Sequence, residues 1–428
     1  MKHTELSFLT TDFSLSATHQ TSFGGRNLYD SVSFCNRCNI CSQVCPIHRL
    51  NSLETDSPRG RNQAIRLVLE RKLELAQPTL QQSFAACTLC GNCAQTCAAH
   101  LPTDQHVLEI QRVLCKRKLP LLLHALLTLR GRSPAFFSIL IRLGLCLRPL
   151  WRLGAYVPGM RWLKPAAARI TQTAPSLKTA FKKAQLPYQT QTPQFIYLPS
   201  LEAEFLQPQI AVSSLRLLTK RGETTCWLNT ASGLFDYVYG DLRQSKRLLR
   251  RLIRQHSQTA LGFLPLVTDS LDVYNFLKQA PQLFEPYDHA TRAARQFAEH
   301  VQFITDFFPE DLTIRSDVKL PVRLDRGALF GRQNESVGKS FSLFKTLFKQ
   351  NFVECEYTDF DTPAFGYAFS AGNQNERLML QVVKQTARKQ IKTIFTFSGL
   401  CALELNDALR RFYPAAKAQH VVSVTDEL

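Results

Sequence analysis

Two runs of four cysteines constrain this chain more than any other feature. The first run is Cys35, Cys38, Cys41 and Cys45, and Pro46 follows it. The second run is Cys87, Cys90, Cys93 and Cys97. Both read C-x2-C-x2-C-x3-C, so each places three thiols on one short loop and a fourth a little farther along. This part of the chain must therefore fold around whatever the thiols bind.

This spacing, with its terminal proline, is the pattern of bacterial ferredoxins that hold two 4Fe–4S clusters. Three thiolates two residues apart can face one cube of iron and sulfide, while the fourth points toward the other cluster. The expected ligands of the first cluster are Cys35, Cys38, Cys41 and Cys97. Those of the second are Cys87, Cys90, Cys93 and Cys45. Ala98 stands where a proline is expected, which leaves the ligands intact.

Zinc and disulfides are the alternative uses of so many cysteines. Zinc sites usually take two C-x2-C pairs, not three cysteines followed by a fourth at x3. Cysteines two residues apart cannot all form disulfides without strain, and no export signal is present. The remaining cysteines stand singly among apolar residues, and most are expected to be buried free thiols: Cys115, Cys146, Cys226, Cys355 and Cys401.

Positive charge is concentrated in one segment. The formal net charge is +18, and fifteen Lys and Arg residues lie between Arg112 and Lys183, where no Asp or Glu occurs. The rest of the chain therefore carries only +3. The segment is leucine-rich at helical spacing, so it can lie on an anionic membrane surface or form a helical linker packed on other domains. Nucleic-acid binding is not expected, because no reading helix or RNA-binding motif accompanies the charge.

The apolar runs are too short to span a membrane. The longest, Leu119–Leu129 and Ala135–Leu147, fall below the ~20 residues that a spanning helix needs. The N-terminus has no charged region followed by an apolar core, so no secretory signal is expected. We therefore expect a cytoplasmic location, with peripheral attachment to the inner face of the cytoplasmic membrane as an option.

The residue patterns predict a multidomain protein of mixed α+β and α/β class. We expect an N-terminal arm over residues 1–30 and an α-helical, two-cluster ferredoxin-like module over 31–118. Residues 119–190 are expected to form the basic helical segment, which ends in a polar linker from 165. Two similar α/β lobes with parallel sheets follow, over 191–310 and 311–428.

Short apolar runs alternate with helical patterns in both lobes. The first lobe is predicted to contain strands at Phe195–Leu198, Thr225–Leu228 and Ala260–Val267. The second is predicted to contain strands at Leu320–Leu324, Phe352–Cys355 and Thr393–Phe397. Because the order of elements repeats, the two lobes are expected to share a topology.

A short basic motif lies between the cysteine runs. Ser57-Pro58-Arg59-Gly60-Arg61 opens an amphipathic helix. Arg59 and Arg61 either offset the negative charge of thiolate-bound iron or simply begin a solvated helix.

Over nearly its whole length the chain resembles the family of the iron–sulfur subunit of bacterial glycolate oxidase. That family includes the lactate-utilisation iron–sulfur protein, the C subunit of anaerobic glycerol-3-phosphate dehydrogenase and heterodisulfide reductase. The resemblance rests on both cysteine runs, on the motif at 57–61 and on Leu147-Arg148-Pro149-Leu150. In the lobes it rests on Gly240-Asp241 before a basic helix and on the run from Thr396 to Cys401.

The lobes depart from the family, whose members normally carry a Cys-Cys-Gly motif in each. The corresponding positions here read Ala231-Ser232-Gly233 and Pro363-Ala364-Phe365-Gly366. The upstream cysteines are replaced around Pro199-Ser200 and Arg326-Gly327, and Cys401 is retained. One cysteine cannot supply the several thiolates that a further cluster needs. The resemblance therefore implies degenerate lobes without a cofactor.

The resemblance implies an electron-transfer subunit. A separate flavoprotein would use FAD to oxidise a 2-hydroxy acid such as glycolate or lactate, and electrons would pass through the two clusters here toward quinone or another acceptor. No catalytic residue is predicted in this chain, which lacks a Rossmann-type glycine pattern. Asp236 and Tyr237, beside the lost motif, are expected on a surface loop. The alternative function is a scaffold subunit that docks a redox complex to a membrane and holds structural clusters.

Overall fold

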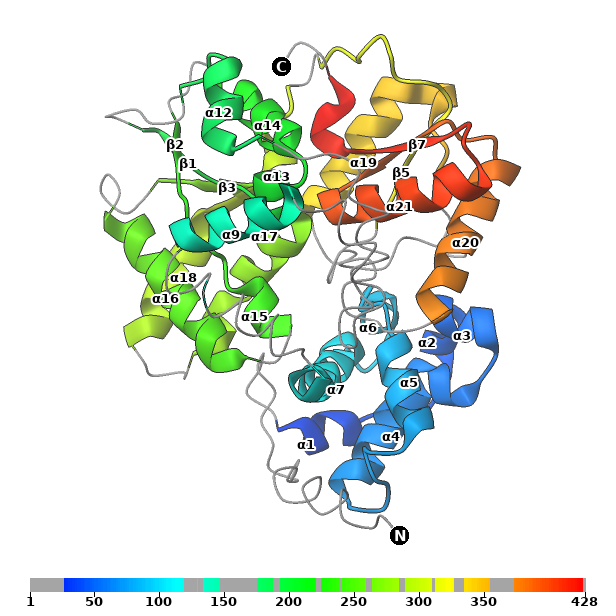
Figure 1. Cartoon of the computed structure of the whole chain (residues 1–428). Helices are drawn as coiled ribbons and strands as arrows, with labels where there is room; N and C mark the ends of the chain where they lie inside the picture. Colours follow the sequence, from blue (N-terminus) through cyan, green and yellow to red (C-terminus); the bar gives the residue numbers. More distant parts are fainter. Residues whose placement is uncertain are drawn as a thin grey trace.

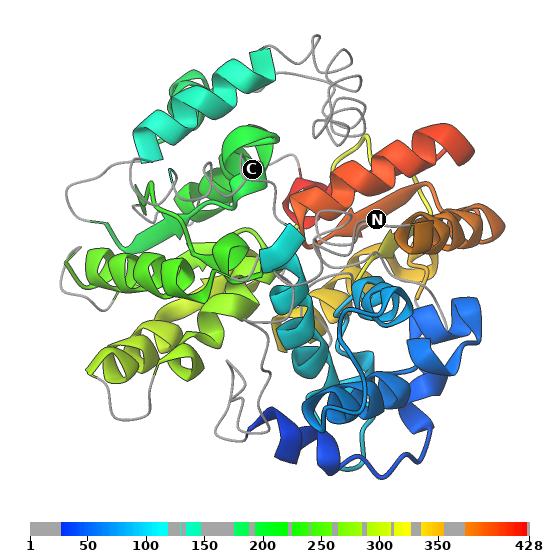
Figure 2. The ribbon, with the colours of Figure 1, turned by 60° about the horizontal axis from the view of Figure 1, so that its bottom comes forward.

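Figures 1 and 2 show the arrangement of the chain in a computed structural model. The residues that it describes are 27–118, 129, 134–146, 175–187, 193–220, 225–238, 241–258, 264–284, 289–309, 312–326, 335–354 and 373–425. Most of the predicted arm at 1–30, the motif at 147–150, Gly240, Gly327 and the replaced position at 363–366 lie outside these residues. So does most of the basic segment between 119 and 174.

Short helices build the N-terminal part. They are α1 (Leu28–Ser33), α2 (Ile40–Gln43), α3 (Pro46–Asn51), the 3-10 turn η2 (Glu54–Asp56), α4 (Pro58–Leu69), α5 (Pro78–Ala86), α6 (Asn92–Gln95) and α7 (Thr103–Lys118). Side-chain caps fix two of the starts: Asn27 accepts from the Asp30 amide, and Ser57 accepts from the Gly60 amide. The longer helices bury Ile65, Phe84 and Leu108 in one core.

The first sheet is parallel throughout, with strand order β2-β1-β3-β4. Its strands are β1 (Phe195–Leu198), β2 (Thr225–Trp227), β3 (Leu266–Thr268) and β4 (Val301–Phe303). The helices between them are α13 (Leu201–Phe205), α14 (Pro208–Lys220), α15 (Leu234–Val238), α16 (Leu242–Gln258), α17 (Leu271–Lys278), the turn η5 (Ala280–Leu283) and α18 (His289–His300). Both faces of a parallel sheet are covered, and β1 accordingly buries Ile196 on one side and Tyr197 on the other.

The second sheet repeats this plan. Its parallel strands are β5 (Val322–Leu324), β6 (Thr393–Thr396) and β7 (Lys417–His420), in the order β5-β6-β7. An isolated parallel bridge joins Val322 to Phe352 on the free side of β5. Phe352 thus lies beside β5 as β2 lies beside β1, and the strand order of the second sheet then matches that of the first. The predicted strand at Phe352–Cys355 is thus reduced to one bridge, and Cys355 lies outside the described residues.

The turn η6 (Ile304–Phe307) follows β4 at the end of the first lobe. Helices and turns complete the second lobe: α19 (Glu335–Phe348), η8 (Lys349–Asn351), α20 (Asn373–Arg388), α21 (Gly399–Phe412) and η10 (Val421–Val424). The strand predicted at Ala260–Val267 was placed too early, because β3 begins at Leu266. The prediction of a polar linker is wrong at α12 (Leu177–Lys183), where Leu177 and Phe181 enter the lobe core.

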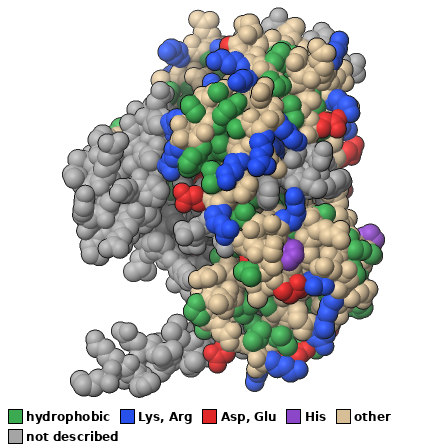
Figure 3. Space-filling view, turned by 90° about the vertical axis from the view of Figure 1, so that its right-hand side faces the viewer, with side chains coloured by type: hydrophobic (Ala, Val, Ile, Leu, Met, Phe, Trp, Pro, Cys, Tyr) green, Lys and Arg blue, Asp and Glu red, His purple; other side chains and the backbone are tan. Residues whose placement is uncertain are grey.

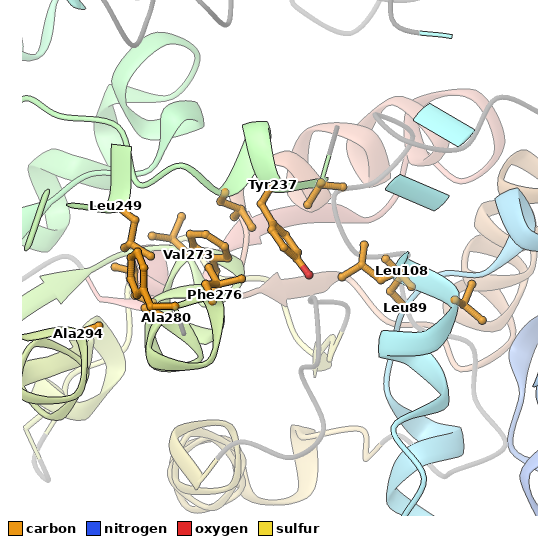
Figure 4. Close-up of a cluster of buried hydrophobic side chains, with 14 of the residues drawn as sticks. Leu89, Leu108, Tyr237, Leu249, Val273, Phe276, Ala280 and Ala294 are labelled. Carbon is orange, nitrogen blue, oxygen red and sulfur yellow. The ribbon is translucent and has the colours of Figure 1, made fainter. Parts of the chain in front are cut away.

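The N-terminal helices and the first lobe share a core. Leu89 and Leu108 lie beside Tyr237 and Phe276 of the lobe (Figure 4). Arg112 of α7 donates from Nε to the Tyr237 carbonyl at 2.9 Å, and its guanidinium lies 4.2 Å from the centre of that ring. Tyr237 is fully buried in α15, and Asp236 is 2% exposed, so the prediction of a surface loop there is wrong.

The surface around α20 and α3 is mixed in character. Apolar side chains are interleaved with Lys and Arg on this face, and Asp and Glu are fewer (Figure 3). Such scattered apolar groups are ordinary on a solvated surface. Among the residues that the structure describes, no helix has the length and apolar character needed to cross a bilayer.

Candidate metal centre

The two cysteine loops have the same backbone turn. In the first, Arg37 and Asn39 flank Cys38 with φ of 54° and 69°. In the second, Leu89 and Gly91 flank Cys90 with φ of 55° and 77°. Left-handed residues on both sides of the middle cysteine tighten each loop, at a cost of about 1 kcal/mol for each residue that is not glycine. A short helix then carries the third cysteine in both loops, α2 or α6.

One pocket gathers thiols from both runs. Its lining includes Cys87, Cys90 and Cys93 of the second run together with Cys45 of the first. The empty space between the lining atoms is about 370 Å³, including the part that opens to solvent. Burial raises the pKa of the Cys87 thiol to about 12 against the lowering effect of Arg61, and Cys45 raises it further. The fourth thiol of the first run thus lies with the three thiols of the second.

Cys97, the fourth thiol of the second run, is predicted to join the three thiols of the first run. Burial raises the pKa of Cys41 to about 11, and the charges of Cys35 and Cys97 raise it further. Such an effect weakens with distance, so it agrees with the prediction that Cys97 belongs to the first group. In the described part of the chain, no three Cys, His, Asp or Glu side chains are placed to hold a single metal ion. Cys45, Cys87, Cys90 and Cys93 line a space instead.

The two groups of thiols differ in exposure. Cys45 and Cys93 are buried, whereas Cys38 of the other group is exposed. Two large apolar side chains close to Cys38 in the sequence are also exposed, Phe34 (56%) and Ile40 (44%). The group that contains Cys38 is therefore the one that faces solvent.

The motif at 57–61 supports both groups. Ser57 caps α4, and Pro58 occupies the first helical position, where no backbone donor is needed. A Cβ on residue 60 would lie 2.0 Å from the Glu54 carbonyl oxygen, so Gly60 allows α4 to start against η2. Arg59 points outward and pairs with both carboxylate oxygens of Glu54, at 2.7 and 3.0 Å.

Arg61 points inward and lines the pocket of Cys45. The side chain is 1% exposed, donates from Nε to the Ser83 carbonyl at 3.0 Å, and places Nη1 4.0 Å from the Cys45 sulfur. A cation among thiols suits an anionic group that is held by thiolates. The donor set and the buried charge of this pocket therefore fit a 4Fe–4S cluster.

Further buried polar groups from α7 lie near this pocket. Asp104 lines it, and burial raises the pKa of this carboxyl to about 6. His106 meets Ser31 Oγ at 2.6 Å and Asn62 at 3.0 Å, and burial lowers the pKa of its imidazole to about 4. Neither residue was predicted from the sequence. Asp104 and His106 are two positions apart at the start of α7, so their side chains point in different directions from the helix.

Ser200, at one of the replaced lobe positions, lies near a junction between the sheets. Ser200 follows β1 and donates its amide to Asp269 Oδ1 at 2.8 Å, and Tyr197 donates its hydroxyl to the same carboxylate. His420 Nε2 lies 2.9 Å from the Asp269 carbonyl oxygen, and burial lowers the pKa of that imidazole to about 4. The hydroxyl of Tyr197, the carboxylate of Asp269 and the imidazole of His420, rather than thiols, occupy this edge of the first sheet.

A family model described as "4Fe-4S dicluster domain" matches residues 31–101. Residues 31–101 are thus similar to domains that hold 4Fe–4S clusters. The glycolate oxidase iron–sulfur subunit of Escherichia coli (strain K12) is 33% identical over 120 residues, which are 27% of this chain and 29% of that relative. The match thus spans less than a third of the relative. No solved structure matches the chain.

These comparisons confirm the resemblance to iron–sulfur subunits that the cysteine spacing led us to expect. Both matches support 4Fe–4S clusters and a role in electron transfer for this chain. The individual ligands stay a prediction, as do the domain boundaries. Among the single cysteines, Cys401 is buried as expected, whereas Cys146 is exposed. The sequence also left the roles of Arg59 and Arg61 open, because burial is decided by the packing of η2 and α5 on α4.

Proposed function

We propose that this chain is the electron-transfer subunit of a flavin-dependent 2-hydroxy-acid dehydrogenase complex of the glycolate or lactate type. The observation that carries the proposal is that Cys45 of the first run lines one pocket with Cys87, Cys90 and Cys93 of the second. Two 4Fe–4S clusters ligated in this crossed way are adjacent, which suits a relay. The 2-hydroxy acid is inferred from the name of the Escherichia coli relative.

The proposed ligands are Cys35, Cys38, Cys41 and Cys97 for one cluster and Cys87, Cys90, Cys93 and Cys45 for the other. Bound iron–sulfur clusters take up and release single electrons. FAD and the oxidation of substrate belong to a partner flavoprotein, and the electrons leave toward quinone or another acceptor. The exposed surface around Cys38 is the side on which exchange with a partner is expected, because electron transfer requires close approach.

A contact between residues 112–183 and an anionic membrane surface is also proposed. Its support among the described residues is α9 (Pro134–Cys146), which exposes Phe136, Ile139 and Leu143. An amphipathic helix flanked by Lys and Arg suits the interface of an anionic bilayer. We place the protein in the cytoplasm, on the inner face of the cytoplasmic membrane, since thiolate ligands need a reducing compartment.

The second candidate function is a scaffold that docks a redox complex to the membrane and holds structural clusters. The shared core of the N-terminal helices and the first lobe favours it, because such a core makes the clusters part of one rigid assembly. The two candidates differ in whether the clusters change oxidation state during turnover.

The experiment that decides between them uses anaerobically purified full-length protein and the co-purifying flavoprotein. Glycolate or lactate is added, and the EPR signals of the iron–sulfur protein are followed. Reduction that needs both the flavoprotein and the 2-hydroxy acid supports the relay. Clusters that dithionite reduces but the flavoprotein with either substrate does not would support the scaffold.

A further inference from the structure

Arg61 is a charged side chain that the protein buries almost completely. It is 1% exposed, and it lies between η2, α5 and the pocket that Cys45 lines. Burial of a cation is costly unless its charge and its donors are satisfied. A guanidinium has five N–H donors, so the number of partners around Arg61 shows what else the site is built to receive.

The partners of Arg61 within the described part of the chain are incomplete. Nε donates to the Ser83 carbonyl at 3.0 Å. Nη2 has no hydrogen-bond partner there, and its closest carboxylate oxygen, on Asp56, is 3.7 Å away. Nη1 is 4.0 Å from the Cys45 sulfur. The buried cation therefore faces Asp56 with Nη2 and the Cys45 sulfur with Nη1, so its Nη1 side is directed at whatever those thiols hold.

We infer that Arg61 raises the reduction potential of the cluster bound by Cys45, Cys87, Cys90 and Cys93 above that of the other cluster. This inference rests on the proposed function. Reduction adds one electron to the cluster and breaks no bond, so it adds negative charge to the pocket. A buried cation nearby stabilises that charge strongly, because the surroundings screen it poorly. Charge, hydrogen bonding and exposure are the means by which proteins set such potentials.

Arg59 provides the contrast on the same helix. It lies near the other group of thiols but is 30% exposed, and Glu54 neutralises it through two hydrogen bonds. Water and the paired carboxylate therefore cancel most of its effect on that cluster. The sequence Arg59-Gly60-Arg61 thus places an exposed charge, hydrogen-bonded to Glu54, at the solvent-facing cluster and a buried charge, 3.7 Å from Asp56, at the buried cluster. Electrons that arrive at the solvent-facing cluster collect at the buried one.

A redox titration with chemical mediators, followed by EPR on the full-length chain, tests this inference. Arg61→Met removes the charge and keeps much of the volume, so we expect the potential of one cluster to fall. Asp56→Asn removes the anion beside Nη2, so the same cluster should shift upward. Each change is expected to alter the oxidised-to-reduced ratio at least tenfold, which is about 59 mV for a one-electron couple. Arg61→Lys keeps the charge and should stay near the wild type.

Two controls identify the cluster that shifts. Cys45→Ser is expected to retain only the solvent-facing cluster, whose potential can then be measured alone. Arg59→Gln should leave the buried cluster unchanged. If Arg61→Met does not load iron, the upward shift in Asp56→Asn decides the matter.

Unchanged potentials in Asp56→Asn, or equal shifts of both clusters in either variant, would overturn the role of Arg61 and leave the relay intact. A wild-type protein whose clusters no mediator can reduce would overturn the relay as well.

Discussion

At the scale of single residues, the site depends on Cys45, which lies with the thiols of the other cysteine run. Cys45 is the N-cap of α3, and Pro46 starts that helix immediately after it. The helix therefore carries the chain away from the first loop while the Cys45 thiol stays in the pocket of the second. A proline at this place is favourable because it has no amide donor to satisfy.

Double variants test the crossed arrangement by counting iron. Cys45→Ser should reduce the iron content from about eight to about four atoms per chain, since one cluster is lost. Adding Cys87→Ser should cause no further loss, because both residues serve the same cluster. Adding Cys35→Ser instead should remove the remaining iron. The opposite pattern, in which Cys45 and Cys35 behave as one group, would show that each run holds its own cluster.

The sequence predicts residue types at the site better than their environments. The spacing of the cysteines is local information, and it led to the dicluster domain. By contrast, Arg59 and Arg61 are two positions apart and equally basic. One is paired with Glu54 at the surface and the other is buried against Ser83. That difference arises from the close approach of α4 to η2 at Gly60, which is a tertiary contact.

At the scale of elements, α9 stands out among the described helices. Phe137 packs edge-on against Phe205 with ring centres 5.7 Å apart, so one side of the helix contacts the first lobe. Phe136, Ile139 and Leu143 follow a helical spacing on another side and are 50%, 61% and 54% exposed. The chain next to both helix ends is basic, with Arg130 and Arg132 before it and Arg148 and Arg152 after it.

Vesicle binding tests the role of this exposed side. Ile139→Ser with Leu143→Ser should weaken sedimentation with anionic phospholipid vesicles tenfold or more, because burial of each side chain in the interface contributes about 1.5–3 kcal/mol. Phe412→Ser on α21 is the matched control, since Phe412 is 56% exposed on another helix. Equal weakening in the control, or equal binding to neutral vesicles, would count against a specific membrane contact.

Strands were predicted well where a short apolar run marks them in the sequence, and poorly where no such run is present. The strand at Phe195–Leu198 was predicted with its observed bounds, and β6 differs by one residue. The strand β7 (Lys417–His420) was not predicted, because Lys417, Ala418 and Gln419 are residues that favour helices over buried strands. Its partner β6 supplies the pairing that the local sequence does not specify.

At the scale of the whole molecule, the two sheets meet through buried polar groups. Glu202 of α13 is 3% exposed, and Ser398 at the end of β6 donates to it at 3.4 Å. A Cβ on Gly399 would lie 2.7 Å from the Glu202 side chain, so the lobes are in close contact. Gln207 also reaches across and donates to the Gly399 carbonyl at 2.8 Å.

The carboxyl of Glu202 makes the stability of this junction depend on pH. Burial, with Asp269 as the next cause, raises its pKa from 4.5 to about 8. The folded protein therefore keeps a proton that the unfolded chain releases between those values. Because of this, the unfolding free energy of the wild type should fall by about 1.4 kcal/mol per pH unit, relative to Glu202→Gln, as pH rises through this window. Urea unfolding of both proteins at pH 6 and pH 8 measures the difference.

Other buried groups titrate in both proteins, so only the difference between them reports on Glu202. His420, for example, contributes in the opposite sense, because its lowered pKa removes stability as pH falls below 6.5. A difference that does not change with pH would show that Glu202 is ionised in the folded protein.

The most direct test of the whole account is iron and sulfide analysis of the anaerobically purified chain, with EPR after reduction by dithionite. Two clusters in the N-terminal domain, and none in the lobes, predict about eight iron atoms per chain and the spectrum of two interacting reduced 4Fe–4S clusters. About twelve iron atoms would contradict lobes whose junction is filled by side chains. About four iron atoms with a single isolated signal would contradict the two crossed groups of thiols on which the proposed relay rests.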